Sequence, residues 1–285
     1  MSVYDRLSLN TATTKRLTLA EALTAAQRAE LSHVGLWRDR VAEVGLEAAA
    51  KLVRDSGLTV TSLCRGGFLT AADEAGQRDA LVDNRAAIVE AETLGTHELI
   101  MVVGGLPAGD RDLVAARQRV AMRIGELAPF ALDHGVRLVL EPLHPMYAAD
   151  RAVISTLGQA LDLAAPHPTA AVGVVVDTFH VWWDPQLPEQ IARAGREGRI
   201  ASYQVCDFNL PIAADALLSR GYMGDGVVDF DCIGRWVTEA GYTGPVEVEI
   251  FNQDIWDTDG DEVIATVKER WVKLVEPSLH PVTVS

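Results

Sequence analysis

Four acidic or amide side chains stand at or near the ends of successive apolar segments in the second half of the sequence. They are Glu141 after "VRLVL", Asp177 after "VGVVV", Gln204 in "YQVCD" and Glu249 in "VEVEIF". Three carboxylates crowded together repel one another unless a cation lies between them, and carboxylate and amide oxygens suit hard divalent ions better than structural zinc. If the segments are neighbouring strands, the set predicts one metal site, with Mn²⁺ favoured and Mg²⁺ or Co²⁺ as alternatives. The alternative is that each acid only solvates a loop or caps a helix; four in succession favour the metal.

The last of these segments offers two acids on one face. Glu247 and Glu249 share that face because strand side chains repeat every two residues. Glu249 lies nearer the carboxyl end and is the expected ligand. Glu247 is expected one layer deeper, where it would orient a ligand or form a buried ion pair, although a slip of register would reverse the two roles.

Eight short apolar segments that could position these residues are spread along the chain. They span residues 6–10, 33–37, 59–64, 98–105, 136–141, 172–177, 201–207 and 245–251. Several are almost continuously apolar, which is typical of parallel strands covered on both faces. Helical spacing of apolar residues is clearest in the segments 18–31, 45–57, 77–95, 112–135 and 156–165.

Alternation of strands and helices eight times predicts the α/β class and a (β/α)8 barrel, a TIM barrel, formed as a single domain over residues 1–285. An open doubly wound sheet is the alternative. Neither a GxGxxG nor a GxxxxGK[ST] phosphate loop occurs in the sequence, which favours the barrel. In such a barrel the catalytic groups gather at the carboxyl ends of the strands.

The composition narrows the class of partner. A net charge of −15 argues against a nucleic-acid surface. No apolar run is long enough for a membrane span, and the first residues lack the apolar core of a signal peptide. The three cysteines are far apart, which disfavours disulfides and thiolate metal sites. We therefore expect a cytoplasmic protein whose partner is a small molecule.

Further polar and aromatic residues adjoin the four expected ligands. His144 follows Glu141 and is either an additional acid or base or a loop histidine bonded to the backbone. Substrate contacts are considered for Arg38, Arg65, Asp207 and Trp183, each against the alternative of local pairing or packing.

The motifs "LEPLHP", "VDTFH", "YQVCDFN" before "GDGVVDF", and "GYTGPVEVEIF" resemble those of the xylose-isomerase-like barrel superfamily, the sugar phosphate isomerase/epimerase family. Its members include ketohexose 3-epimerases, hydroxypyruvate isomerase and inosose dehydratase. The resemblance implies that Glu141, Asp177, Gln204 and Glu249 hold one divalent metal. It also implies that Glu141 and Glu249 form the acid/base pair and that His180 contacts substrate.

Two positions depart from the ketohexose epimerases. Gln204 stands where they have histidine, as in hydroxypyruvate isomerase, and Leu210 stands where they have a substrate-binding arginine. The endonuclease members of the superfamily use a His-rich multi-zinc site, which seven histidines and a strongly negative charge do not match.

Three functions follow as hypotheses. The first is a metal-dependent sugar or polyol isomerase or epimerase of carbohydrate metabolism, acting by proton abstraction next to a carbonyl through a metal-stabilised enediolate. The second is a lyase on the same scaffold, either the metal-bearing subunit of a C-glycoside deglycosidase or an inosose-type dehydratase, with His144 as base. The third is a non-catalytic sugar-binding barrel. A homo-oligomer is expected, and the deglycosidase hypothesis adds a small β-rich subunit.

Overall fold

The fold follows from the alternation of apolar strands with amphipathic helices. The computed structural model describes residues 2–280. The strands that form a closed parallel barrel are β1 (Leu7–Asn10), β2 (His33–Trp37), β3 (Thr59–Gly67), β4 (Glu98–Val102), β5 (Arg137–Leu140), β6 (Val172–Asp177), β7 (Ile200–Val205) and β10 (Val246–Val248). The barrel closes through the parallel pairing of β1 with β10. The predicted (β/α)8 barrel is confirmed.

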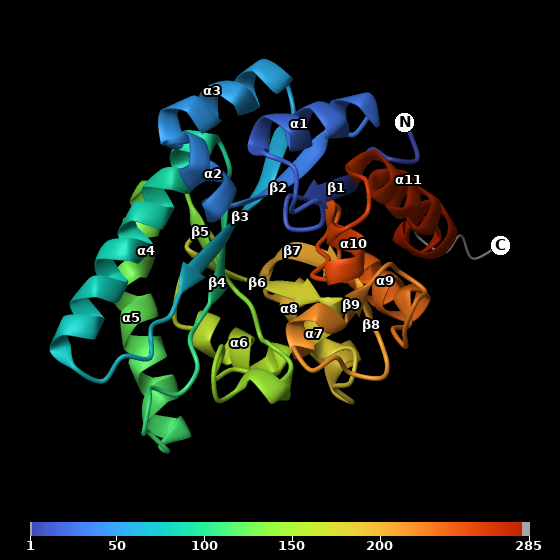
Figure 1. The fold of residues 1–285 in the computed structure, drawn as a ribbon. Helices are drawn as coiled ribbons and strands as arrows, with labels where there is room; N and C mark the ends of the chain where they lie inside the picture. The colour runs from blue at the N-terminus through green and yellow to red at the C-terminus, as the bar shows by residue number, and fades with distance from the viewer. Residues whose placement is uncertain (1, 281–285) are drawn as a thin grey trace.

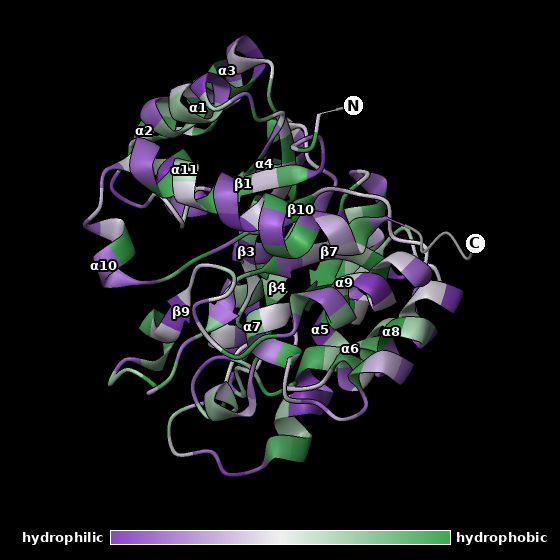
Figure 2. Ribbon diagram, turned by 90° about the vertical axis from the view of Figure 1, so that its right-hand side faces the viewer, coloured by the Kyte–Doolittle hydropathy of each residue, from purple (hydrophilic) through white to green (hydrophobic). Residues whose placement is uncertain are grey.

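Helices cover the outside of the barrel (Figure 1). The longer ones are α1 (Leu19–Arg28), α2 (Arg38–Val44), α3 (Leu46–Ser56), α4 (Glu74–Leu94), α5 (Leu113–Asp133), α6 (Leu157–Ala164), α8 (Leu187–Arg196), α9 (Phe230–Glu239) and α11 (Gly260–Arg270). Hydrophobic and hydrophilic residues alternate along these helices in Figure 2, as expected for helices that pack one face on a sheet. Short helices follow some strands: α7 (Thr178–Val181), α10 (Gln253–Trp256) and the 3₁₀ turns η1 (Pro145–Tyr147) and η2 (Ala216–Ser219). The π turn η3 (Trp271–Val275) and the 3₁₀ turn η4 (Glu276–Leu279) follow α11.

Each of the five helical segments expected from the sequence contains a helix. The capping residues explain where several begin: Thr18 accepts a hydrogen bond from the Glu21 backbone, and the Glu21 carboxylate accepts one from the Thr18 backbone, which is a complete capping box. Asp73 caps α4 and Thr156 caps α6 more simply, because only the side-chain oxygen of each capping residue takes part.

One small sheet was not predicted. The two-residue strands β8 (Asp207–Phe208) and β9 (Arg220–Gly221) pair antiparallel, and they fold the segment after β7 back over the carboxyl end of the barrel. Across residues 2–280, no helix combines the length and the apolar character that a bilayer crossing requires.

Candidate active site

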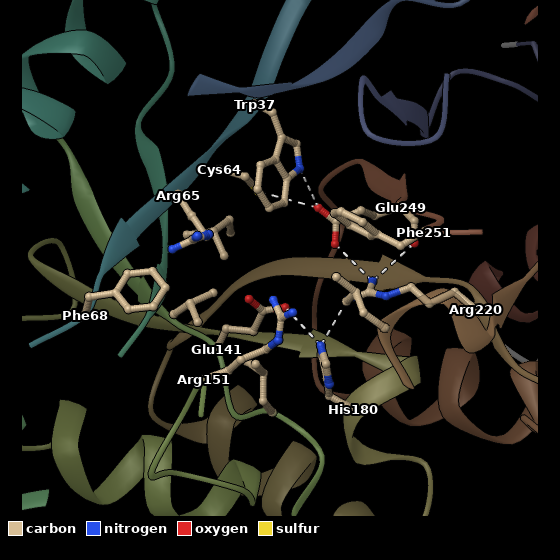
Figure 3. Close-up of a pocket in the computed structure, with 14 residues that line it drawn as sticks. Trp37, Cys64, Arg65, Phe68, Glu141, Arg151, His180, Arg220, Glu249 and Phe251 are labelled. Carbon is tan, nitrogen blue, oxygen red and sulfur yellow. Dashed lines mark hydrogen bonds and ion pairs between the residues drawn. The ribbon is translucent and has the colours of Figure 1, made fainter. Parts of the chain in front are cut away.

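A cavity opens at the carboxyl ends of the strands. Strand-end polar groups form one part of it: Glu141, His180, Arg220 and Glu249, with Arg65 and Arg151. Its walls are aromatic and aliphatic: Trp37, Phe68, Phe251, Ile100, Val102, Leu143 and Leu217, with Cys64. Figure 3 shows the charged side chains converging on this space. A cleft that combines apolar walls with a few converging polar groups is typical of small-molecule sites.

Two carboxylates at the ends of β5 and β6 share a buried environment. Glu141 is 5% exposed and Asp177 is 1% exposed. Burial, together with the charges of Asp177 and Glu249, raises the pKa of Glu141 well above its ordinary value. Burial also raises the pKa of Asp177 to about 6, although the Arg220 guanidinium opposes that shift. Burial and neighbouring negative charge favour the protonated form of both carboxyl groups unless a cation takes the place of the protons.

Arg220 of β9 supplies one such charge. Its Nη1 donates to Glu249 Oε2 at 3.0 Å and to Asp177 Oδ2 at 3.4 Å, so one guanidinium joins the ends of β10 and β6. The other oxygen of Glu249 accepts a hydrogen bond from Trp37 Nε1 at 2.9 Å. Glu249 therefore meets donors at both oxygens, as an ionised carboxylate does.

The charge of the cluster suits a divalent cation. Glu141, Asp177 and Glu249 would carry three negative charges when ionised, and Arg220 balances one of them. Two negative charges remain in a region that is almost fully buried. One divalent ion would neutralise them, whereas without it the carboxyl groups keep protons.

The side chain of Gln204 in β7 could bind the same divalent ion. Its Nε2 donates to Glu247 Oε1 at 3.1 Å, and its Oε1 is buried without a hydrogen-bond partner within residues 2–280. Gln204 pairs in register with Asp177 on one side and Glu247 on the other. A buried acceptor without a donor is costly, and a cation would satisfy it. Glu141, Asp177, Gln204 and Glu249 are thus the residues that could hold the metal.

Glu247 lies below this level and is fully satisfied by donors. Its Oε1 accepts from Asn10 Nδ2 at 2.6 Å, and its Oε2 accepts from Thr61 Oγ1 at 2.6 Å and Ser62 Oγ at 2.9 Å. With Gln204 Nε2, these donors fix the carboxylate in the barrel interior. Glu247 orients the amide of Gln204 and leaves the upper acids to face the cavity, in agreement with the register expected from alternation.

His180, in α7, lines the cavity. Its Nδ1 lies 3.1 Å from the backbone N–H of His144. Its Nε2 lies 3.1 Å from Arg220 Nη2, which can only donate, and 3.8 Å from both Glu141 Oε1 and Asp177 Oδ2. Burial lowers the pKa of His180 well below its ordinary value, which favours the neutral ring. The ligand atoms of Glu141, Asp177 and His180 lie within 4.8 Å of one another, so His180 could hold a metal together with these acids or contact substrate.

Two of the residues considered from the sequence lie behind the cavity wall. His144 stacks on Phe208 with ring centroids 5.4 Å apart, and its Nδ1 accepts from the backbone N–H of Met146. Trp183 packs edge-on against His144 and donates from Nε1 to the His180 carbonyl. Neither is among the described residues that line the cavity. They hold His180 in place.

Two others are engaged elsewhere. Arg38 forms ion pairs with Glu90 and Asp83 of α4, so its guanidinium points to the outer helix layer. The Asp207 carboxylate accepts hydrogen bonds from the backbones of Phe208, Gly224 and Val228, which organises the loop that carries β9. Arg65, by contrast, lines the cavity as expected.

The sequence analysis missed Arg220, Arg151 and the aromatic pair Trp37 and Phe251. Leu210 was expected to leave the site without an arginine after β7, but the β8–β9 pairing returns Arg220 to it from further along the chain. The closeness of "SRGYMGDG" to the quoted "GDGVVDF" motif was the available signal. Trp37 ends β2, and its ring meets Phe251 at 5.3 Å, a contact between distant segments that no local pattern shows.

Comparison with known proteins agrees with the barrel fold. The family model described as xylose isomerase-like TIM barrel matches residues 20–273. The chain belongs to this family. A curated relative, the inosose isomerase of Bacillus licheniformis, is 26% identical over 212 residues, which cover 73% of each chain.

Two solved structures show how closely the fold matches. A protein of Sinorhizobium meliloti superposes with a TM-score of 0.93 at 46% identity, covering 96% of this chain and 99% of the other. The IolI protein, solved with a zinc atom, has a TM-score of 0.83 at 21% identity over 96% of this chain and 99% of its own. The similarity to IolI shows the shared fold.

Proposed function

We propose that this family member is a divalent-metal-dependent isomerase or epimerase of a sugar or polyol. The observation that carries the proposal is the buried set of Glu141, Asp177 and Glu249, of which Asp177 and Glu249 pair with Arg220, together with the buried, unpaired amide oxygen of Gln204, which pairs in register with Asp177. The inosose isomerase relative and the zinc found in IolI support a reaction and a cofactor of this kind.

Different residues of the chain carry out the two proton transfers. A divalent cation held by the four ligands would polarise neighbouring carbonyl and hydroxyl oxygens of the substrate as a Lewis acid. Glu249 is the assigned base, since both of its oxygens meet donors and it is held in its acceptor form. It takes the proton from the carbon beside the substrate carbonyl, and the electron pair moves toward the carbonyl oxygen to give an enediolate.

Glu141 is assigned the second proton transfer because it lines the cavity together with Glu249, and the family resemblance pairs these two glutamates as acid and base. Figure 3 shows its carboxylate reaching the cavity from the side opposite Glu249. Return of the proton to the other face of the same carbon gives an epimer. Transfer to the neighbouring carbon gives an aldose–ketose isomer. His180 lines the same cavity and is the proposed contact to substrate.

The geometry favours this reaction over the lyase. A lyase with His144 as base needs that imidazole in the cavity, whereas it stacks on Phe208 and contacts Trp183 behind the wall. The non-catalytic sugar-binding barrel is disfavoured as well, because simple binding has no need for three buried carboxylates.

The test measures deuterium incorporation from D₂O into a panel of ketoses and inososes in the presence of Mn²⁺. Glu141→Gln and Glu249→Gln are each expected to slow exchange by roughly 10²- to 10⁴-fold, because the general acid or base is lost. Glu98→Gln is the matched control, since Glu98 is a largely buried glutamate paired with Arg137 outside the cavity. Normal exchange in Glu249→Gln together with its loss in His144→Ala would support the lyase instead.

A further inference from the structure

The cavity contains two arginines that the cluster around Arg220 does not use. Arg65 extends from β3, and Arg151 extends from the segment between η1 and α6. Both side chains reach the drawn cavity in Figure 3, where Arg65 lies on the side opposite Arg220. Arg220 is paired with two carboxylates. Within residues 2–280, neither Arg65 nor Arg151 has a carboxylate within hydrogen-bonding distance.

Arg65 is held in place by aromatic rings rather than by acids. Its guanidinium carbon lies 4.1 Å from the centroid of the Phe68 ring and 5.9 Å from that of Trp37. These rings fix the plane of the guanidinium and leave its N–H groups free. Burial lowers the pKa of Arg65, and the nearby charge of Arg151 adds to that effect.

Other arginines show how unusual this environment is. In the described part of the chain, the remaining arginines whose side chains form no ion pair or hydrogen bond lie on the exposed surface, where water solvates them: Arg54, Arg85, Arg111 and Arg196. Arg65 is only partly exposed. A guanidinium that has lost part of its hydration without gaining an acceptor is destabilising unless a ligand supplies one.

Arg151 is incompletely satisfied as well. Its Nε is buried without a hydrogen-bond partner in residues 2–280, and Asp150 Oδ2 lies 3.7 Å away, beyond hydrogen-bonding range. The guanidinium carbon lies 5.6 Å from the centroid of the Tyr147 ring. Both arginines therefore offer free donors, and both are positioned by aromatic side chains.

The two positive charges at one cavity indicate the charge of the ligand. Neutral amide side chains bind sugar hydroxyls equally well, and their use would avoid the repulsion between Arg65 and Arg151. An anionic group removes that repulsion and accepts several guanidinium donors at once. We propose that the substrate is a monosaccharide carrying a carboxylate or a phosphate, and that Arg65 and Arg151 bind this group. The assignment of the rest of the ligand as a sugar rests on the proposed function.

The test compares three molecules with the same carbon skeleton: D-fructose, D-fructuronate and D-fructose 6-phosphate. Binding to the Mn²⁺-loaded full chain is measured by titration calorimetry, so that no turnover is required. At least one anionic sugar is expected to bind tenfold or more tightly than D-fructose. Preference for the phosphate indicates a sugar phosphate, and preference for the carboxylate indicates an acidic sugar.

The variants assign that preference to the two arginines. Arg65→Met and Arg151→Met are each expected to weaken binding of the preferred anion at least tenfold more than they weaken binding of D-fructose. Arg65→Lys should restore part of the loss, since the charge returns without the planar donors. Arg78→Met is the matched control, because Arg78 is an exposed arginine of α4 outside the cavity.

Equal or absent binding of all three sugars overturns the proposal, as does an equal loss for neutral and anionic sugars in Arg65→Met. Failure of the proposed function is distinguishable from both results. If no sugar exchanges deuterium but the anion preference depends on Arg65 and Arg151, the reaction assignment fails and the anion site stands.

Discussion

The side-chain amide of Gln204 is oriented by Glu247, with Nε2 and Oε1 3.1 Å apart. Because the amide nitrogen donates downward to this carboxylate, the amide oxygen is the atom left for the site above it. A histidine ligand commonly gains its orientation from a carboxylate behind it. In this barrel a carboxylate orients a glutamine in the same way.

The first prediction concerns Glu247→Ala. Without the carboxylate, Asn10 Nδ2 and Gln204 Nε2 lose their shared acceptor, so the Gln204 amide can turn or shift. Affinity for Mn²⁺ is expected to fall about 10- to 100-fold, as for other residues that orient metal ligands. Titration calorimetry measures it, with Glu98→Ala as the buried control. Unchanged Mn²⁺ affinity would show that Glu247 does not orient a ligand.

The second prediction concerns Gly35 of β2. A Cβ at this position would lie 2.4 Å from the Glu247 Cδ, and the four donors around that carboxylate prevent it from moving away freely. Gly35→Ala is expected to cost about 1–3 kcal/mol of unfolding free energy through overpacking, and to weaken Mn²⁺ binding through Gln204.

Urea denaturation and Mn²⁺ titration measure the two effects of Gly35→Ala. Gly125→Ala is the control, since the nearest atom to its Cβ would be 3.9 Å away and the residue lies in α5. Loss of stability with full Mn²⁺ affinity would place the strain elsewhere.

The candidate ligands were predictable because their signal is local. Glu141, Asp177, Gln204 and Glu249 each end or follow a run of apolar residues, and alternation separates Glu249 from Glu247. Arg38 and Arg65 show the limit of such reasoning. Both stand near strand ends, but Arg38 begins α2 and turns to the acids of α4, whereas β3 continues to Gly67 and keeps Arg65 at the cavity.

The sequence analysis missed Arg220 for a different reason. Its place depends on the antiparallel pairing of β8 with β9, strands of two residues each that have no periodicity to detect. The Asp207 carboxylate supports that pairing by accepting hydrogen bonds from the backbones of Gly224 and Val228. No sequence pattern predicts these bonds either.

The third prediction concerns Arg220→Met. Removal of the guanidinium leaves Asp177 and Glu249 without their buried counter-charge, which is expected to lower the unfolding free energy by about 3–5 kcal/mol in metal-free protein. Mn²⁺ would then compensate the same carboxylates, so the rise in melting temperature on adding Mn²⁺ should be larger for the variant than for the unmodified protein. A smaller rise would indicate that Arg220 helps to bind the metal rather than substituting for part of its charge.

The last prediction concerns pH. Burial raises the pKa of Asp177 from an ordinary 3.8 to about 6. Since the folded state holds this proton more tightly than the unfolded state, the metal-free protein should lose stability as pH rises from about 4 to 6, with the loss complete above the raised pKa. A cation requires the ionised carboxylate, so protons compete with it below pH 6. The rise in melting temperature produced by Mn²⁺ should therefore be small at pH 5 and grow up to about pH 7. Scanning fluorimetry across this range with and without Mn²⁺ measures both trends. Asp177→Asn should flatten the first trend, because the amide carries no titrating proton. A Mn²⁺ effect that is constant from pH 5 to pH 7.5 would exclude Asp177 as a ligand whose proton the metal displaces.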